Sequence, residues 1–72
     1  MNEYTVIYEQ ATDGGWGAYA PDLPGLGVVG DTIEEAERLI REGIKIYLDE
    51  LKAEGKPSPR ITTRVAVVKI PA

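Results

Sequence analysis

A single helical segment in an otherwise strand-like chain is the feature that most limits how this protein can fold. Between Thr32 and Gly55, apolar residues recur every three or four positions, which predicts one amphipathic helix. The Thr32 hydroxyl can accept a hydrogen bond from the Glu35 amide while the Glu35 carboxylate reaches back, a capping box that marks the helix start. Gly55 and Pro57 end the helix. One helix can cover only one face of a sheet, so any sheet in this chain has a second face to cover.

Four segments outside the helix have strand composition, with β-branched and aromatic residues or alternating apolar positions. They cover residues 4–9, 16–20, 26–29 and 61–70. Asp13-Gly14-Gly15 predicts a turn between the first two segments. The prolines of residues 21–25 interrupt regular secondary structure before the third segment. A right-handed crossover through the helix places the last strand parallel to the first. We therefore predict a single α+β domain over residues 1–72, a two-layer β-β-β-α-β sandwich with sheet order 3-2-1-4.

Charge and missing residue types exclude several classes of function. The chain carries 8 basic and 12 acidic residues, a net charge of −4, which is the wrong sign for binding a phosphate backbone. It has no histidine, no cysteine and one serine, Ser58, so neither a Ser–His–Asp nor a Cys–His arrangement can form. The start at Met1 lacks a signal-peptide pattern, and no apolar run approaches the ~20 residues that span a bilayer. We expect a soluble, cytoplasmic, non-enzymatic protein that uses no cofactor and does not bind nucleic acid or a membrane.

Asp13, Asp22 and Asp31 lie in predicted turns and are the residues on which a third hypothesis, a residual metal-dependent nuclease, would depend. Carboxylates of this kind can gather around a divalent cation. However, aspartate in turns and before helices is explained by hydrogen bonds between its side chain and the backbone. Ribonuclease H has a similar element order and a catalytic carboxylate inside its first strand, whereas the first strand here has only residues 5–8 at its centre, none of them acidic. We favour the turn interpretation and expect no metal site.

The apolar content of the predicted sheet exceeds what one helix can cover. Both faces of the last strand and both sides of the first bring apolar groups. At ~25 cal/mol per Å², a few hundred Å² left in water would forgo several kcal/mol, comparable with the ~3–5 kcal/mol that a core of this size supplies. We therefore predict a homo-oligomer, a dimer or tetramer, in which Arg64, Val65 and Val67 of the last strand pair with or swap into a second chain.

Charge is also segregated along the chain in a way that suits such pairing. Residues 1–30 carry four acids and no base, and residues 56–72 carry four bases and no acid. A last strand beside the first would place Glu3 and Glu9 near Arg60, Arg64 or Lys69, within one chain or between two.

Several exposed side chains are candidates for contact with another protein. Two aromatic residues three positions apart on one strand point to opposite faces and cannot both face one core. Helix residues beside the main apolar stripe are not needed to cover one sheet face. The predicted partner-binding residues are Trp16, Tyr19, Leu39, Glu42, Ile46 and Glu50.

An ordered set of motifs resembles the HicB-like antitoxins of prokaryotic toxin–antitoxin pairs. The set spans nearly the whole chain and comprises Asp13-Gly14-Gly15-Trp16, Pro21-Asp22-Leu23-Pro24-Gly25, Gly30-Asp31-Thr32 with Glu35-Ala36, and Tyr47-Leu48-Asp49-Glu50-Leu51. The resemblance implies a partial ribonuclease-H-like fold without its active site. It also implies that the protein neutralises a HicA-type toxin, a small basic mRNA-cleaving protein, by covering its RNA surface and catalytic histidine. An acidic chain suits a basic partner.

Two departures from the family pattern are visible. Leu26 stands where the family often has cysteine after Pro-Gly, and fuller members continue into a DNA-binding domain where this chain stops at Ala72. Autorepression by this chain alone is therefore not expected. The alternative function is an orphan interaction module whose only partner is itself.

Overall fold

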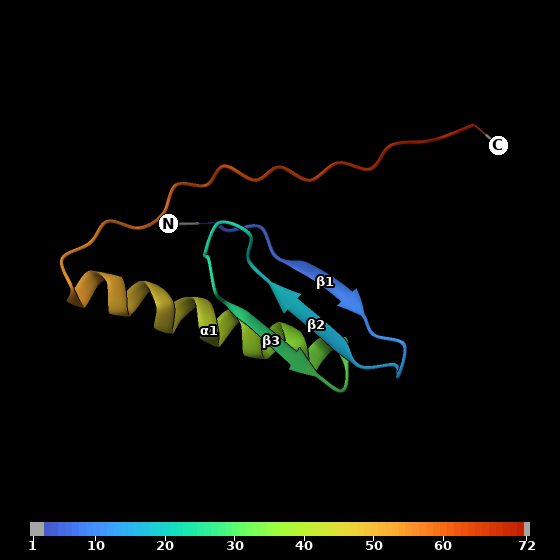
Figure 1. The fold of residues 1–72 in the computed structure, drawn as a ribbon, viewed down its shortest axis with the longest axis horizontal. Coiled ribbons are helices and arrows are strands. Elements are labelled where there is room, and N and C mark those ends of the chain that lie inside the picture. The colour runs from blue at the N-terminus through green and yellow to red at the C-terminus, as the bar shows by residue number, and fades with distance from the viewer. Residues whose placement is uncertain (1–2, 72) are drawn as a thin grey trace.

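The structure, a computed structural model, describes residues 3–71 and contains one antiparallel sheet and one helix (Figure 1). The strands are β1 (Ile7–Gln10), β2 (Trp16–Tyr19) and β3 (Gly27–Gly30), in the order β1-β2-β3. Helix α1 (Ile33–Ala53) packs against β3 and β2. The prediction of an α+β fold is confirmed. The chain ends Met1, Asn2 and Ala72 lie outside the described residues.

The turn between β1 and β2 depends on Asp13 and Gly14. Gly14 has a φ of +93°, a backbone conformation that glycine adopts without strain. The Gly15 amide donates to Asp13 Oδ1 at 2.9 Å, and the Ala11 amide donates to the Gly15 carbonyl at 2.8 Å. Asp13 is therefore a turn residue, as the favoured interpretation of its sequence position predicts.

The capping box at the start of α1 is confirmed. The Glu35 amide donates to the Thr32 hydroxyl at 3.1 Å, and the Glu35 carboxylate accepts from the Asp31 amide at 3.0 Å. At the other end, Gly55 has a φ of +74°, and the Lys56 amide donates to the Leu51 carbonyl at 2.9 Å. The helix thus begins and ends at signals that act over a few residues.

The core is small and lies between α1 and one face of the sheet. Ala18, Ala36 and Ile40 are buried there, and partly buried side chains including Trp16 and Val28 pack against them. Two alanines at the centre let the helix backbone approach the sheet closely. The other face of the sheet, which we call the open face, carries Val29 at 80% exposure and has no second layer within residues 3–71.

The fourth strand predicted over residues 61–70 is wrong for the single chain. Residues 56–71 form no strand; their first half runs back along the body, where side chains hold Pro59, Thr62 and Thr63, and their last part projects away from it (Figure 1). Sheet order 3-2-1-4 is therefore not formed within one chain, and β1 remains an edge strand. The physical reason is that α1 lies over β3 and β2, so a strand beyond β1 would gain little apolar cover from the helix.

Candidate interaction surfaces

Four predicted partner-binding residues form one stripe along α1, which we call the helix flank: Leu39, Glu42, Ile46 and Glu50. Their spacing of three or four residues places them on one side of the helix. Ile46 is 59% exposed, Leu39 is half-buried, and both glutamates are exposed. Glu42 also lies 3.7 Å from the exposed Arg38 guanidinium, a surface pair of small energetic value. The helix flank therefore presents an apolar side chain between two carboxylates.

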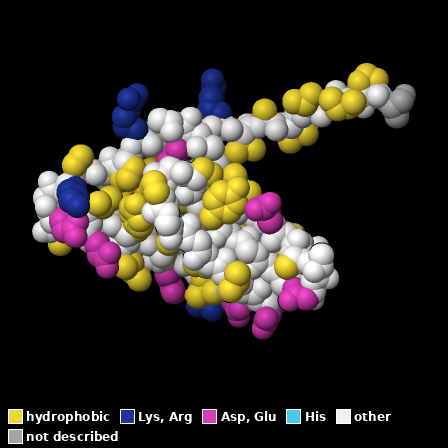
Figure 2. Space-filling view, in the orientation of Figure 1, with side chains coloured by type: hydrophobic (Ala, Val, Ile, Leu, Met, Phe, Trp, Pro, Cys, Tyr) yellow, Lys and Arg dark blue, Asp and Glu magenta, His cyan; other side chains and the backbone are white. Residues whose placement is uncertain are grey.

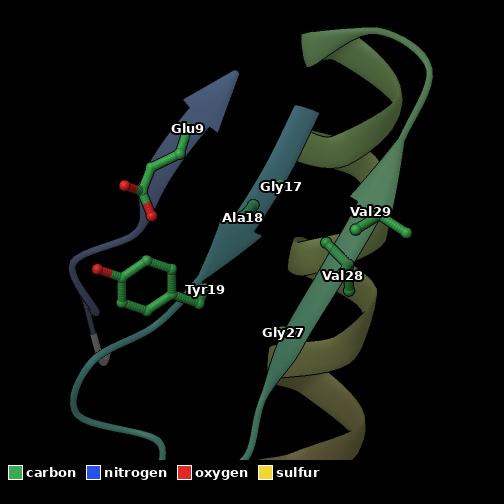
Figure 3. Close-up of a pocket in the computed structure, with 7 residues that line it drawn as sticks. All are labelled: Glu9, Gly17, Ala18, Tyr19, Gly27, Val28 and Val29. Carbon is green, nitrogen blue, oxygen red and sulfur yellow. The ribbon is translucent and has the colours of Figure 1, made fainter. Parts of the chain in front are cut away.

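Trp16 and Tyr19 lie on opposite faces of β2, as the strand period predicts. Trp16 is half-buried and packs against the core on the α1 side. Tyr19 is 40% exposed on the open face (Figure 3). The structure does not bring these two residues into one surface, and neither lies on the helix flank.

The open face contains a shallow hollow of about 420 Å³ that sequence reasoning missed (Figure 3). Its floor includes Gly17 and Gly27, and Glu9, Tyr19 and Val29 stand around it. The strand register pairs Gly17 with Val29 and Tyr19 with Gly27, so each glycine lies beside a larger side chain. Because the two glycines carry no side chain, another protein surface can approach the sheet backbone here. The only sequence signal was glycine at two positions of the same strand phase as Tyr19 and Val29.

The Asp22 carboxylate holds the segment that follows the helix, in an arrangement we call the Asp22 clamp. Its Oδ2 accepts from the Thr62 and Thr63 amides, both at 3.1 Å. Its Oδ1 accepts from their hydroxyls at 2.9 and 2.7 Å. The Thr63 hydroxyl, with the further hydrogen bonds from Thr62 and the two amides, holds the pKa of Asp22 below its usual range. Asp22 therefore serves as an anchor for distant backbone.

The candidate carboxylates do not gather into a metal centre. Among residues 3–71, no three histidine, cysteine, aspartate or glutamate side chains are arranged to hold a metal ion. Asp13 is engaged by its own turn, and Asp22 by the threonine pair.

The three predicted oligomer-interface residues lie in residues 64–71, which we call the C-terminal arm. Arg64 is exposed, Val65 is 69% exposed and Val67 is 96% exposed. No hydrogen bond or ion pair joins the arm to the rest of residues 3–71. Apolar side chains line the projecting segment in space-filling view (Figure 2). The arm is thus an extended, apolar and unpaired strand-like segment.

The helix of the described chain is too polar to cross a lipid bilayer. This agrees with its two exposed ion pairs, Glu37–Arg41 and Arg38–Glu42.

Comparison with known proteins gives a consistent family assignment. A family model described as "HicB_like antitoxin of bacterial toxin-antitoxin system" matches residues 4–71. UPF0150 protein ssr1765 of Synechocystis sp. is 46% identical over 57 residues, which are 79% of this chain and 72% of that protein. UPF0150 protein Ta0767 of Thermoplasma acidophilum is 38% identical over 58 residues, 81% of this chain and 84% of the relative. No solved structure matches the chain significantly.

Proposed function

This chain belongs to the HicB-like antitoxin family, and on that premise we propose that it binds and neutralises a HicA-type mRNA-cleaving toxin. It acts in the cytoplasm as a homo-oligomer, dimer or tetramer, with Arg64, Val65 and Val67 at the contact between copies. Neutralisation is non-catalytic and works by covering the toxin surface that would bind RNA. The absence of histidine and cysteine from the chain supports a binding role over nucleophilic catalysis.

The observation that carries the proposal is the helix flank. Ile46 offers an exposed apolar side chain on a rigid element, and Glu42 and Glu50 add negative charge on either side of it. Apolar burial at the centre of an interface supplies affinity, and complementary charge at the rim orients the partner. A chain of net charge −4 is complementary in charge to a small basic toxin.

Leu39, Trp16 and Tyr19 complete the proposed toxin contact in different ways. Leu39 extends the helix flank by one turn. Tyr19 lies on the open face, so it contributes from the far side of the sheet, at the contact between copies in the toxin-binding oligomer, and Trp16 contributes the part of its ring that the core leaves exposed.

An RNA-cleavage assay with a purified HicA-type toxin tests the proposal. Adding the chain in increasing amounts should abolish cleavage near equimolar ratio, and the two proteins should co-elute. Ile46→Ser should weaken toxin binding at least ~10-fold, because an exposed apolar anchor is removed. Lys45→Ser, one residue away on the same helix, is the matched control and should leave binding unchanged. Undiminished cleavage without co-elution would remove the proposal.

The C-terminal arm supports a second candidate function, an interaction module that associates only with itself. Its four large apolar side chains, Val65, Val67, Val68 and Ile70, are between 69% and 96% exposed in one chain. If self-association persists while every toxin assay fails, this second function replaces the first.

A further inference from the structure

The outer edge of β1 has unpaired backbone groups. With sheet order β1-β2-β3, only one side of β1 is bonded, through the register that joins Ile7 to Tyr19 and Gln10 to Trp16. An unpaired edge of this kind is a template for another strand. Within residues 3–71 no strand occupies it.

The C-terminal arm has the length and composition of the missing strand. Its eight residues extend to about 26 Å at ~3.3 Å per residue, similar to the span of residues 3–10 that run through β1. Apolar residues lie on both of its faces, Val65 and Val67 in one phase and Val68 and Ile70 in the other. Its backbone groups, like those on the outer edge of β1, have no protein partner within residues 3–71.

The way the arm is held favours a partner outside its own chain. The Asp22 clamp fixes Thr62 and Thr63, and the Thr5 hydroxyl donates to the Thr63 carbonyl at 3.3 Å, so the base of the arm is joined to the chain by side chains rather than by a backbone ladder. Beyond Thr63 the segment leaves the body (Figure 1). An arm that returned to its own β1 would leave its open-face row of apolar side chains in water, because one chain has no second layer on that face within residues 3–71.

We infer that two copies of this chain exchange their C-terminal arms, each arm pairing along the outer edge of β1 in the other copy. The exchange brings the two open faces together, so that one row of arm side chains is covered with Tyr19 and Val29 over the glycine-floored hollow. This inference rests on the homo-oligomer of the proposed function, and it specifies how the two copies of the chain contact each other. It is independent of any toxin.

Charge complementarity agrees with a second copy as the occupant. Each arm carries only basic charge, Arg64 and Lys69, whereas Glu9 lies in β1 and Glu3 lies in the segment before it. Opposite charges on neighbouring strands stabilise pairing, and like charges oppose it. Because each copy supplies both an arm and an edge, the contact is self-complementary and closes at two chains.

Cysteine pairs test the exchange directly, because the natural chain has no cysteine. A mass-tagged chain carrying Ile7→Cys is unfolded and refolded with an untagged chain carrying Val65→Cys, Ala66→Cys or Val67→Cys, and the mixture is then oxidised. Neighbouring residues on paired strands lie close enough for a disulfide. At least one mixture should give a disulfide-linked pair of unlike chains. Lys52→Cys on the helix, mixed with the same tagged chain, is the control and should give none.

The remaining outcomes overturn the inference. Placing Ile7→Cys and the arm cysteine in one chain should still give linked dimers, whereas an internal disulfide in a monomer would show that the arm folds back. Links only between two arm cysteines would show pairing of arm with arm, and no links would show that the arm is not at β1.

Light scattering gives a second readout: Val67→Asp should raise the dissociation constant of the dimer at least ~30-fold, and Val67→Ile should not. No toxin is present, so failure here leaves toxin neutralisation to be judged by its own assay.

Discussion

Ile40 and Ile46 are the same residue type on one helix, and only their burial differs. Ile40 is 1% exposed and packs with Ala18 and Ala36, whereas Ile46 is 59% exposed. Replacement by alanine removes the same atoms at both positions and improves helix propensity equally, by a few tenths of a kcal/mol. Any difference in stability between the two variants therefore reports packing against the sheet.

The expected difference is large for a domain of this size. Truncating a buried isoleucine to alanine costs ~2–5 kcal/mol, because the surrounding core collapses only in part. A core of this size supplies only ~3–5 kcal/mol in total, so Ile40→Ala should leave much of the protein unfolded at 25 °C. Ile46→Ala should change the free energy of unfolding by less than ~0.5 kcal/mol.

Urea unfolding measures both variants, with helix circular dichroism and the fluorescence of Trp16, the one tryptophan, as independent probes. All samples need the same chain concentration, because self-association shifts apparent stability. Equal losses for Ile40→Ala and Ile46→Ala would refute the assignment of the core to this face of α1.

Three further changes have definite expected outcomes. Thr32→Ala should lower the free energy of unfolding by ~1 kcal/mol and Thr32→Ser should restore it, since the hydroxyl accepts from the Glu35 amide; identical urea midpoints would contradict this. Gly30→Ala should destabilise the fold, because the added carbon would lie 2.9 Å from the Ala36 backbone nitrogen. Gly43→Ala should be neutral or stabilising, because its added carbon meets only the end of the Leu26 side chain. A lower melting temperature for Gly43→Ala than for Gly30→Ala would contradict this. The Asp22 clamp should be complete above about pH 4 and should open as the pH falls through the lowered pKa of Asp22, because the folded state favours the carboxylate; NMR signals of the Thr62 and Thr63 amides that stay constant in acid, or in Asp22→Asn, would argue against it.

The helix and its ends could be predicted because their signals are local. Thr32 and Glu35 are three residues apart, and Gly55 ends the helix through its own backbone conformation. The strand period likewise placed Trp16 and Tyr19 correctly on opposite faces of the sheet, because side chains at successive strand positions point to opposite faces. No long-range information was needed for either result.

The Asp22 clamp could not be predicted, because its donors are 40 and 41 residues away along the chain. An aspartate between prolines satisfies the rules for a turn residue, and nothing nearby marks it as an anchor. The partner of the last segment was hidden for a related reason. Alternation in residues 61–70 indicates strand composition. However, the sheet edge with which this segment pairs depends on where α1 lies over the sheet, and the sequence does not show whether the pairing edge belongs to the same chain or to a second copy.

The mass of the particle in solution tests most directly the claim that this chain needs a second protein surface to cover its arm and open face. Multi-angle light scattering at micromolar concentration should report at least twice the 7.8 kDa of one chain. A stable particle of 7.8 kDa that retains its helix and unfolds cooperatively would contradict the account.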